Sequence, residues 1–500
     1  MLKFFSCILF LLEIPEFIQG IAQLYGFRPS NHGIYNITGN FWNPGPYAGY
    51  LAVIFPIALY WTLKLYPSLR SLNKETFNMI FQRPLLAGDY LTFGLAAVCV
   101  FGTISILPAT MSRSAWLAAL TGGGLVIINL YACMPRVKNY IKLHTLRSSL
   151  IGIIFVFLIG VGCYATYHLK KDSADGRLLL WKISWQTFRQ HPWTGVGKGH
   201  FAGAFGQTQA AYFASGEGTP EEEKIAGAPV YGFNEFLQIG VEHGLTGLLL
   251  FLIMTGGAIW TVACSKQTGT AGIAASLSAC LVFACFSYPF SIPQLQKLFV
   301  ALLFAAAYFS SDGFLTSDYR IWITRTLILI PLYPVLINQQ NNPEWIKARR
   351  RWKEEQRYYE MKIYQGTVDN YRELYPLLKN NIEFLFEYGQ CLSKTGQYEE
   401  SNLILTEGIK RSADPMFHNI MGQNYQALKQ YAKAEAAFFQ ALYRVPHRLL
   451  PRYFLTKLYW TSGDTLKARQ MGEILLEKEP KIMSPAVKEM KEEITQLLNP

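Results

Sequence analysis

Long apolar runs, each about as long as a bilayer is thick, constrain this chain more than any other feature. A helix needs about 20 mainly apolar residues to cross the hydrocarbon core of a membrane. Nine stretches fit before residue 340: 4–22, 46–64, 89–109, 114–133, 149–168, 244–264, 271–288, 296–311 and 321–337. Lys, Arg and Glu are concentrated after that point. We therefore predict an all-α chain, with a polytopic bundle of about nine transmembrane helices followed by a domain in water.

Charges between these runs orient the bundle. Segments 65–88 and 134–148 carry three and four Lys or Arg residues, and basic short loops stay in the cytoplasm. Segments 23–45, 110–113 and 169–243 then lie outside, and so does the C-terminal domain if all nine runs cross. If one of the last two runs is only re-entrant, that domain is cytoplasmic, which the basic run 348–353 mildly favours. The first run lacks a cleavage site after it, which favours a helix over a signal peptide.

Two function classes are disfavoured by composition. The formal charge of +12 could indicate a nucleic-acid partner, but many of the basic residues lie in short loops and no nucleic-acid-binding motif accompanies them. None of the eight cysteines forms a CxxC pair, and those in apolar runs include Cys99, Cys163, Cys264, Cys280 and Cys285. A metal site or a disulfide framework is therefore not expected.

Residues of one type recur at a fixed spacing near the C-terminus. The pairs are 33 or 34 positions apart: Gly389 and Gly422, Tyr398 and Tyr431, Ala434 and Ala468, Pro446 and Pro480. This pattern resembles the tetratricopeptide repeat over about 383–480, and a further helical pair is expected at 344–378. The alternative is a helical domain without repeats. Such stacks expose a concave face that usually binds a protein or peptide partner. We expect a membrane domain at 1–338 and an α-solenoid at 339–500.

The outer segments carry polar groups that could do chemistry. Arg113 lies between two runs with almost no loop, where an arginine is costly unless it faces a partner or water. Its guanidinium suits phosphate oxygens, although it could equally reach a lipid headgroup. The sequence Asn43-Pro44-Gly45-Pro46 is typical of a turn that enters a helix.

The long segment 169–243 begins with an amphipathic pattern. Apolar residues recur at helical spacing: Leu178, Trp181, Trp185 and Phe188. This predicts a helix in the membrane interface, with Arg177 at its start. His191 and a proline end it, and a glycine-rich turn that contains Lys198 follows. Arg177 and Lys198 could face an anion or anchor to lipid phosphates. We interpret 214–229 as a flexible flap whose glutamates face solvent.

The same segment closes with ionisable residues at the mouth of the next span. Asn234 could cap a helix that carries Glu235, and Glu242 and His243 follow where the span begins. Ionisable groups at such a place are functional candidates by default. A carboxylate there could act as a general base. Capping is the alternative role for Glu235.

Four segments, taken in order, resemble the O-antigen ligase and polymerase superfamily over about residues 38–250. They read GNFWNPGPYAGYLA, SRSAW, GRLLLW…HPWTGVGKGHF and FNEFLQIGVEHGLTGLL. The resemblance implies a membrane-embedded glycosyltransferase of the bacterial inner membrane that uses no metal or cofactor. Its donor would be a glycan on undecaprenyl diphosphate, used at the periplasmic face, and its acceptor lipid A–core, another glycan or a protein. A ligase module followed by tetratricopeptide repeats resembles versions from Bacteroidetes-like bacteria.

The resemblance also implies roles for single residues. The family's loop arginines correspond to Arg113 and Arg177, which would hold the diphosphate. The catalytic candidates are Arg177, Glu235 and His243. The substrate-binding candidates are Arg113, Arg177, His191, Lys198, Asn234 and Glu242. Ligases often have a catalytic histidine where this chain has Phe233, so another group serves as base or none is needed. The chain also starts several helices later than many members.

Ligation to lipid A–core is the leading expectation for function. A repeat-unit polymerase and a protein O-glycosylating enzyme remain alternatives, because sequence does not identify the acceptor. A different class is a non-catalytic membrane scaffold that binds proteins through its repeats. A transporter is less favoured, because its expected sign is broken helices with polar residues at the midplane.

Overall fold

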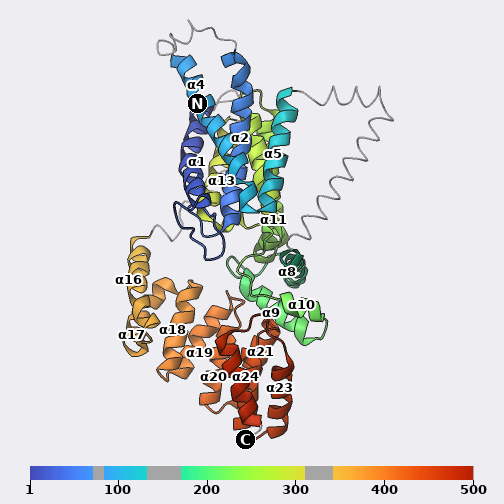
Figure 1. Cartoon of the computed structure of the whole chain (residues 1–500), viewed down its shortest axis with the longest axis vertical. Coiled ribbons are helices and arrows are strands. Elements are labelled where there is room, and N and C mark those ends of the chain that lie inside the picture. The colour runs from blue at the N-terminus through green and yellow to red at the C-terminus, as the bar shows by residue number, and fades with distance from the viewer. Residues whose placement is uncertain (71–83, 132–170, 310–341, 499–500) are drawn as a thin grey trace, which may run out of the picture. The chain divides into compact units, whose positions relative to one another are not determined.

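The computed structural model describes residues 1–70, 84–131, 171–309 and 342–498, in which every regular element is a helix (Figure 1). The predicted spans 149–168 and 321–337 lie outside these residues. The chain divides into two compact units. The first comprises Met1–Lys170, Phe233–Phe236 and Leu248–Leu336. The second comprises Lys171–Gly232, Leu237–Gly247 and Ile337–Pro500, so the long segment between spans and the C-terminal helices belong to one unit.

The first unit is built of apolar helices. They are α1 (Leu2–Leu24), α2 (Pro44–Arg70), α4 (Pro84–Ile106), α5 (Arg113–Tyr131), most of α11 (Glu235–Cys264), α12 (Thr270–Ala284) and α13 (Pro293–Phe309), with the short turns η2 (Pro108–Thr110) and η3 (Pro289–Ser291). Within the described residues, five helical stretches are long and apolar enough to cross a membrane, in α1, α2, α4, α5 and α11. The predicted spans 271–288 and 296–311 form the shorter apolar helices α12 and α13.

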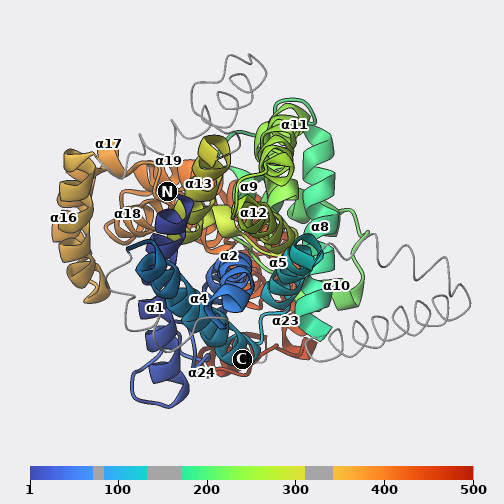
Figure 2. The same ribbon diagram turned by 90° about the horizontal axis from the view of Figure 1, so that it is seen from above.

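Helix α2 is the centre of this unit. It packs against α4, α5 and α12, which surround it when the unit is seen along its helices (Figure 2). Small residues allow the close approach: a Cβ on Gly122 of α5 would lie 2.4 Å from Pro56 of α2. Glycine at helix crossings is the usual device of membrane bundles, where contact area rather than water exclusion drives association. The indole of Trp61 is buried and donates a hydrogen bond to Ser6 Oγ (2.9 Å), which ties α1 to α2.

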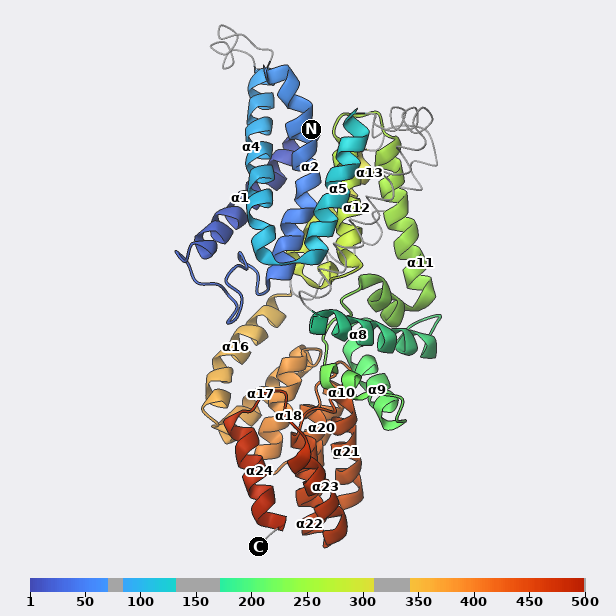
Figure 3. The same cartoon turned by 45° about the vertical axis from the view of Figure 1, so that its right-hand side comes forward.

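The C-terminal part of the second unit is a series of short helices. They are α16 (Pro343–Glu360), α17 (Tyr364–Leu378), α18 (Ile382–Lys394), α19 (Tyr398–Ile409), α20 (Met416–Ala427), α21 (Tyr431–Arg444), α22 (Leu450–Thr461), α23 (Thr465–Glu477) and α24 (Pro485–Leu498). From α16 to α23 consecutive helices pack as pairs (Figure 3). The repeated glycines lie where the members of a pair cross, Gly389 against Leu405 and Gly422 against Phe438. That the pairs belong to the tetratricopeptide family stays a prediction.

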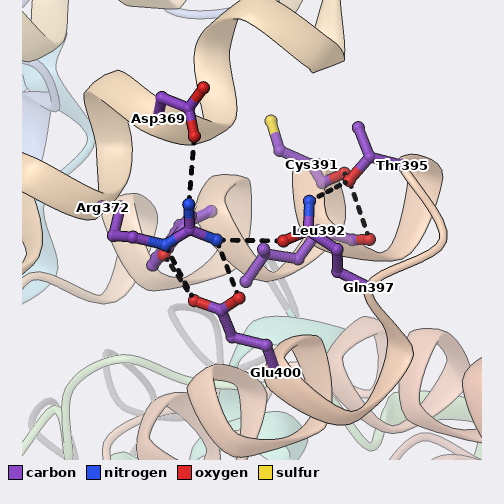
Figure 4. A network of polar contacts seen from close by, with 8 residues as sticks. Asp369, Arg372, Cys391, Leu392, Thr395, Gln397 and Glu400 are labelled. Atoms are coloured by element: carbon purple, nitrogen blue, oxygen red, sulfur yellow. Dashed lines mark hydrogen bonds and ion pairs between the residues drawn. The ribbon is translucent and has the colours of Figure 1, made fainter.

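Polar contacts at the surface join one pair to the next. The Arg372 guanidinium on α17 donates to Glu400 of α19 (2.9 Å), to Gln397 (2.9 Å) and to Asp369 (3.0 Å), as Figure 4 shows. The hydrogen bonds from Arg372 lower the pKa of the Glu400 carboxyl. Both side chains are more than a third exposed, so the pair contributes at most about 1 kcal/mol.

The loop part of the second unit is helical as well. Helix α8 (Lys171–Gln190) confirms the predicted helix: Leu179, Leu180 and Ile183 are buried in the unit, whereas Leu178 and Trp185 are exposed. It is followed by α9 (Phe201–Ala214) and α10 (Pro220–Ile225). A second apolar face is thus left on α8, which suits the expected contact with a membrane surface.

Helix α9 packs on α21 and closes against the C-terminal helices (Figures 1 and 3). The amide of Gln209, buried on α9, donates to the backbone oxygens of Gly227 (2.8 Å) and Arg444. Gly203 lies against the carbonyl groups of Ile409 and Lys410 at the end of α19. Segments more than 200 residues apart in the sequence therefore share one buried core.

The prediction of solvated glutamates at 214–229 holds for Glu221, which is exposed, but it missed the ion pairs of Glu222 and Glu223; that the segment is a flexible flap stays a prediction. Residues Pro220–Ile225 form a helix with a capping box between Thr219 and Glu222. Glu222 pairs with Lys182 (2.8 Å) and Glu223 with Lys478 (2.9 Å). The sequence pattern missed this because the cations come from α8 and from the C-terminal end of the chain.

Candidate functional site

The glycine-rich turn after α8 folds around the second half of the long segment. Gly195, Gly197 and Gly199 have φ of 70°, 97° and 76°, a region that side chains other than glycine rarely adopt. Backbone hydrogen bonds run from Val196 N to the Val241 oxygen and from Gly197 N to the Glu242 oxygen, both 2.9 Å long. The three glycines thus let the turn lie flat against residues 241–245.

The helix that receives this turn is broken at Gly244. Its φ of 66° and ψ of −169° lie in a region that is essentially restricted to glycine. A Cβ at this position would lie 2.2 Å from the backbone oxygen of Trp193, in the turn. Helix α11 is therefore two helices, and the second begins where the predicted span 244–264 begins. The break leaves Glu242 and His243 at the end of the first.

Three of the predicted site residues meet at this break. The Glu242 side chain is 12% exposed, and the backbone oxygen of Glu242 accepts the N–H of Gly197 in the turn. His243 Nε2 lies 4.0 Å from Glu242 Oε2, and the imidazole is 45% exposed. The charge of Lys198 acts on both side chains. A largely buried carboxylate beside an accessible imidazole is a suitable arrangement for moving a proton.

The other predicted residues of the loop lie at varying distances from this group. His191 is exposed and opens the turn, where its carbonyl oxygen accepts the N–H of Gly195 (3.1 Å). Arg177 is partly buried on α8, in the same unit as the turn. Arg113 is partly buried at the first position of α5, in the first unit.

Residues 233–235 anchor the start of α11 within the first unit. Glu235 is 3% exposed, and its Oε1 accepts the N–H of Phe290 (2.7 Å) in η3. Phe233 has φ of 48° and packs edge-on against Tyr288, with the ring centroids 4.9 Å apart. Asn234 between them is partly buried. This geometry favours a positioning role for Glu235 over direct proton transfer.

Two polar clusters were missed by the sequence reasoning. On the loop, Lys182 Nζ donates to Tyr212 Oη (2.6 Å) and to Glu222 (2.8 Å), and Glu222 raises the pKa of Lys182. In the first unit, Glu13 is buried in α1 and accepts a hydrogen bond from Thr103 (3.1 Å). An ionisable residue inside an apolar run was the signal for Glu13. Nothing in the spacing pointed to Lys182.

Metal ligation finds no support in the part of the chain that the structure describes. No group of three or more His, Cys, Asp or Glu side chains is placed there to hold an ion. The chemistry available at the α11 break is that of a lysine, a carboxylate, an imidazole and backbone N–H groups.

The apolar helices and the break in α11 define a membrane protein with a polar site on a structured loop. A family model described as O-antigen ligase matches residues 97–252. The matched stretch contains Arg113, Arg177, the glycine-rich turn and the break at Gly244, and it supports the class of membrane glycan ligases and polymerases. A search among curated proteins gives no match.

Proposed function

We propose that this chain transfers a glycan from undecaprenyl diphosphate to an acceptor at the periplasmic face of the bacterial inner membrane, with lipid A–core as the favoured acceptor. The observation that carries the proposal is the turn containing Lys198, which closes on Glu242 and His243 inside the segment that matches O-antigen ligases. The family match supports a lipid-linked glycan as donor.

In the proposed mechanism, cationic side chains bind the diphosphate. Arg113 and Arg177 hold its oxygens and offset the charge that develops as the bond from C1 to the phosphate oxygen breaks. The electron pair of that bond leaves with the diphosphate. Lys198 adds a further positive charge at the turn, and His191 and Asn234 contact the substrate from the ends of the segment.

His243 is the proposed general base. Its exposed imidazole takes the proton of the acceptor hydroxyl as the oxygen attacks C1 from the face opposite the diphosphate, which inverts the anomeric configuration. Glu242, 4.0 Å away, stabilises the imidazolium that forms. Glu235 is the alternative base, although its hydrogen bond with Phe290 favours a positioning role.

The proposed location of the C-terminal helices follows from the second unit. Because α9 and α21 share a core, we place these helices on the same side of the membrane as the loop, which is the periplasmic side in this proposal. The packing disfavours the alternative in which only the C-terminal domain is cytoplasmic.

The test is the glycan profile of a deletion strain complemented with variants. Wild type is compared with Arg177→Ala, with His243→Ala and with Arg189→Ala, a matched control that removes an exposed arginine from the same helix α8. Lipopolysaccharide, protein glycans and lipid-linked precursor are measured separately. We expect wild type and Arg189→Ala to restore the polymer, and the two site variants to leave precursor accumulated.

The polymer that is lost identifies the acceptor. Loss of lipid A-linked glycan indicates a ligase, short chains still on the lipid carrier indicate a polymerase, and loss of protein glycans indicates a protein glycosylating enzyme. An unchanged profile in the deletion strain, with no paralogue present, would contradict glycan transfer. It would favour the scaffold, for which Phe233 at the position of the family's histidine is the supporting observation.

A further inference from the structure

A cavity of about 420 Å³ lies within the second unit, between the loop and the C-terminal helices. The loop contributes Ala202 and Ala228–Val230 to its wall. The helices contribute aromatic rings and charged groups, among them Phe386, Phe417 and Glu383. Its size lies within the range of small-molecule sites, about 300–1,000 Å³. The cavity is separate from the α11 break and none of the proposed catalytic residues lines it.

Some of the charged groups in the wall have structural partners. Glu387 accepts hydrogen bonds from Trp352 and Tyr371, both 2.8 Å long, so its carboxylate is committed to the helix packing. Other charged side chains in the wall can still form hydrogen bonds or ion pairs with a ligand. Glu383 lies in the first turn of α18 and makes no hydrogen bond or ion pair with the residues that the structure describes. Arg448 reaches Asp414 only at 3.7 Å.

Arg411 connects this cavity to the glycine-rich turn. Its Nη2 donates to Asn380 (3.1 Å), which leaves further N–H groups of the fork for other contacts. A Cβ on Gly199 would lie 3.1 Å from its Nη1, so the guanidinium touches the turn itself. Two residues before Gly199, the N–H of Gly197 donates to the backbone oxygen of Glu242 (2.9 Å). The wall of the cavity therefore continues into the residues that hold the proposed reaction site.

The lining selects the chemistry of the occupant. The partly buried rings of Tyr359 and Phe386 offer apolar surface, Glu383 accepts hydrogen bonds, and Arg411 and Arg448 donate them. A sugar matches this set, because its C–H faces pack on rings while its hydroxyls both donate and accept. A ligand rich in phosphate would be repelled by the carboxylates. An extended peptide usually adds to a strand edge, and helices line this cavity.

We propose that the cavity is a glycan-binding subsite that holds sugar residues of the donor or acceptor chain beside the α11 break. The subsite gives the C-terminal helices a direct part in substrate selection, rather than a role in recruiting proteins alone. Its assignment to the glycan of the reaction rests on the proposed transfer function.

The test measures binding of an oligosaccharide to the full-length protein in nanodiscs. The probe is the oligosaccharide released by mild acid from the lipid-linked glycans of the parent strain, and calorimetry gives its affinity. Glu383→Gln and Arg448→Ala are each expected to weaken binding about tenfold. Val230→Trp, which places a large ring at an exposed edge of the cavity, should weaken it at least as much. The matched controls Glu473→Gln and Arg469→Ala, on α23 outside the cavity, should bind like wild type.

The outcomes separate this inference from the proposed function. Binding by wild type that the three cavity variants lose supports the subsite, even if the glycan profile of the deletion strain refutes transfer. Equal affinity in wild type and all three variants overturns the subsite, even if transfer is intact. Saturable binding of an unglycosylated peptide that the cavity variants lose, with no binding of the oligosaccharide, also overturns it and assigns the cavity to a protein partner.

Discussion

Gly203→Ala tests whether α9 is docked on the C-terminal helices. In the structure Gly203 faces the end of α19, and an added Cβ would lie 2.1 Å from the backbone oxygen of Lys410 and 2.7 Å from that of Ile409. Both obstacles are backbone atoms at a helix terminus, so neither can rotate away as a side chain could. The added methyl group must push α9 off α19 by about 1 Å to reach an ordinary contact distance.

The expected cost combines two opposing terms. Overpacking a tight interface costs about 1–3 kcal/mol, and a backbone obstacle puts this site at the upper end. Replacing glycine by alanine inside a helix stabilises that helix by about 1 kcal/mol. The net loss is about 2 kcal/mol, which for a unit of about 150–250 residues lowers the melting temperature by about 4–8 °C. Separation of α9 from α19 would also stretch the hydrogen bonds of Gln209, so this value is a lower bound.

The assay is thermal unfolding of the full-length protein in detergent, with Gly176→Ala as control. Gly176 lies inside α8, and a Cβ added there would meet nothing within 4 Å, so alanine should raise the melting temperature by about 2–4 °C. The two variants introduce the same methyl group and differ in the sign of the expected shift. A rise for Gly203→Ala equal to that for Gly176→Ala would refute the packing of α9 on α19.

Three further outcomes follow from single residues. Burial, and then the charge of Arg444, lowers the pKa of His418 to about 3, whereas this histidine in the unfolded chain binds a proton below about pH 6.5. The contribution of His418 to the free energy of unfolding is therefore complete above about pH 6.5 and is lost as the pH falls toward about 3, by about 2 kcal/mol at about pH 5. His418→Gln should flatten this pH dependence in urea titrations. Gly244→Ala forces a side chain into a glycine-only region and should reduce transfer at least tenfold while circular dichroism retains the helix signal; full activity would contradict the strained break. Glu235→Gln can still accept the Phe290 N–H and should keep transfer within a few-fold of wild type, whereas loss by orders of magnitude would identify Glu235 as the base.

The elements were largely predictable because their signals are local. Apolar length alone located the membrane-length helices in the described residues, and helical spacing from Leu178 to Phe188 located the core of α8. The start of the second half of α11 was placed at 244, where apolar residues resume and Gly244 breaks the helix. The repeat spacing anticipated paired helices, because the small residues that recur are those at which two helices cross.

The packing partners were not predictable by the same reasoning. A periodic pattern reports that a helix has a buried face and does not identify what covers it. Lys182 and Glu222 are 40 residues apart, and Gln209 and Arg444 are 235 apart. The interpretation of residues 214–229 missed the ion pairs of Glu222 and Glu223 for this reason, because the acidic run was judged without the lysines that pair with it.

For the candidate site, the sequence supplied residue types and the structure supplied their grouping. Lys198, Glu242 and His243 were all selected from the sequence and do meet at the break in α11. Glu235 was selected for the same reason as Glu242, because both are ionisable residues near the mouth of the next predicted span. Only tertiary contacts separate them: Glu235 is bonded to the Phe290 N–H, whereas Glu242 lies beside an exposed imidazole.

Helix α9 connects the two halves of the functional hypothesis. Its aromatic residues Phe201 and Phe205 are buried. Gly203 and Gly206 on the same helix pack against residues 409–413 of the C-terminal helices rather than against the loop. The turn that leads into the same helix is hydrogen-bonded to Glu242, from the N–H of Gly197 to the Glu242 backbone oxygen (2.9 Å). A displacement of the C-terminal helices would therefore be transmitted to the proposed catalytic pair through one rigid element. This coupling gives a physical reason for a glycan bound among those helices to influence the reaction at the break in α11.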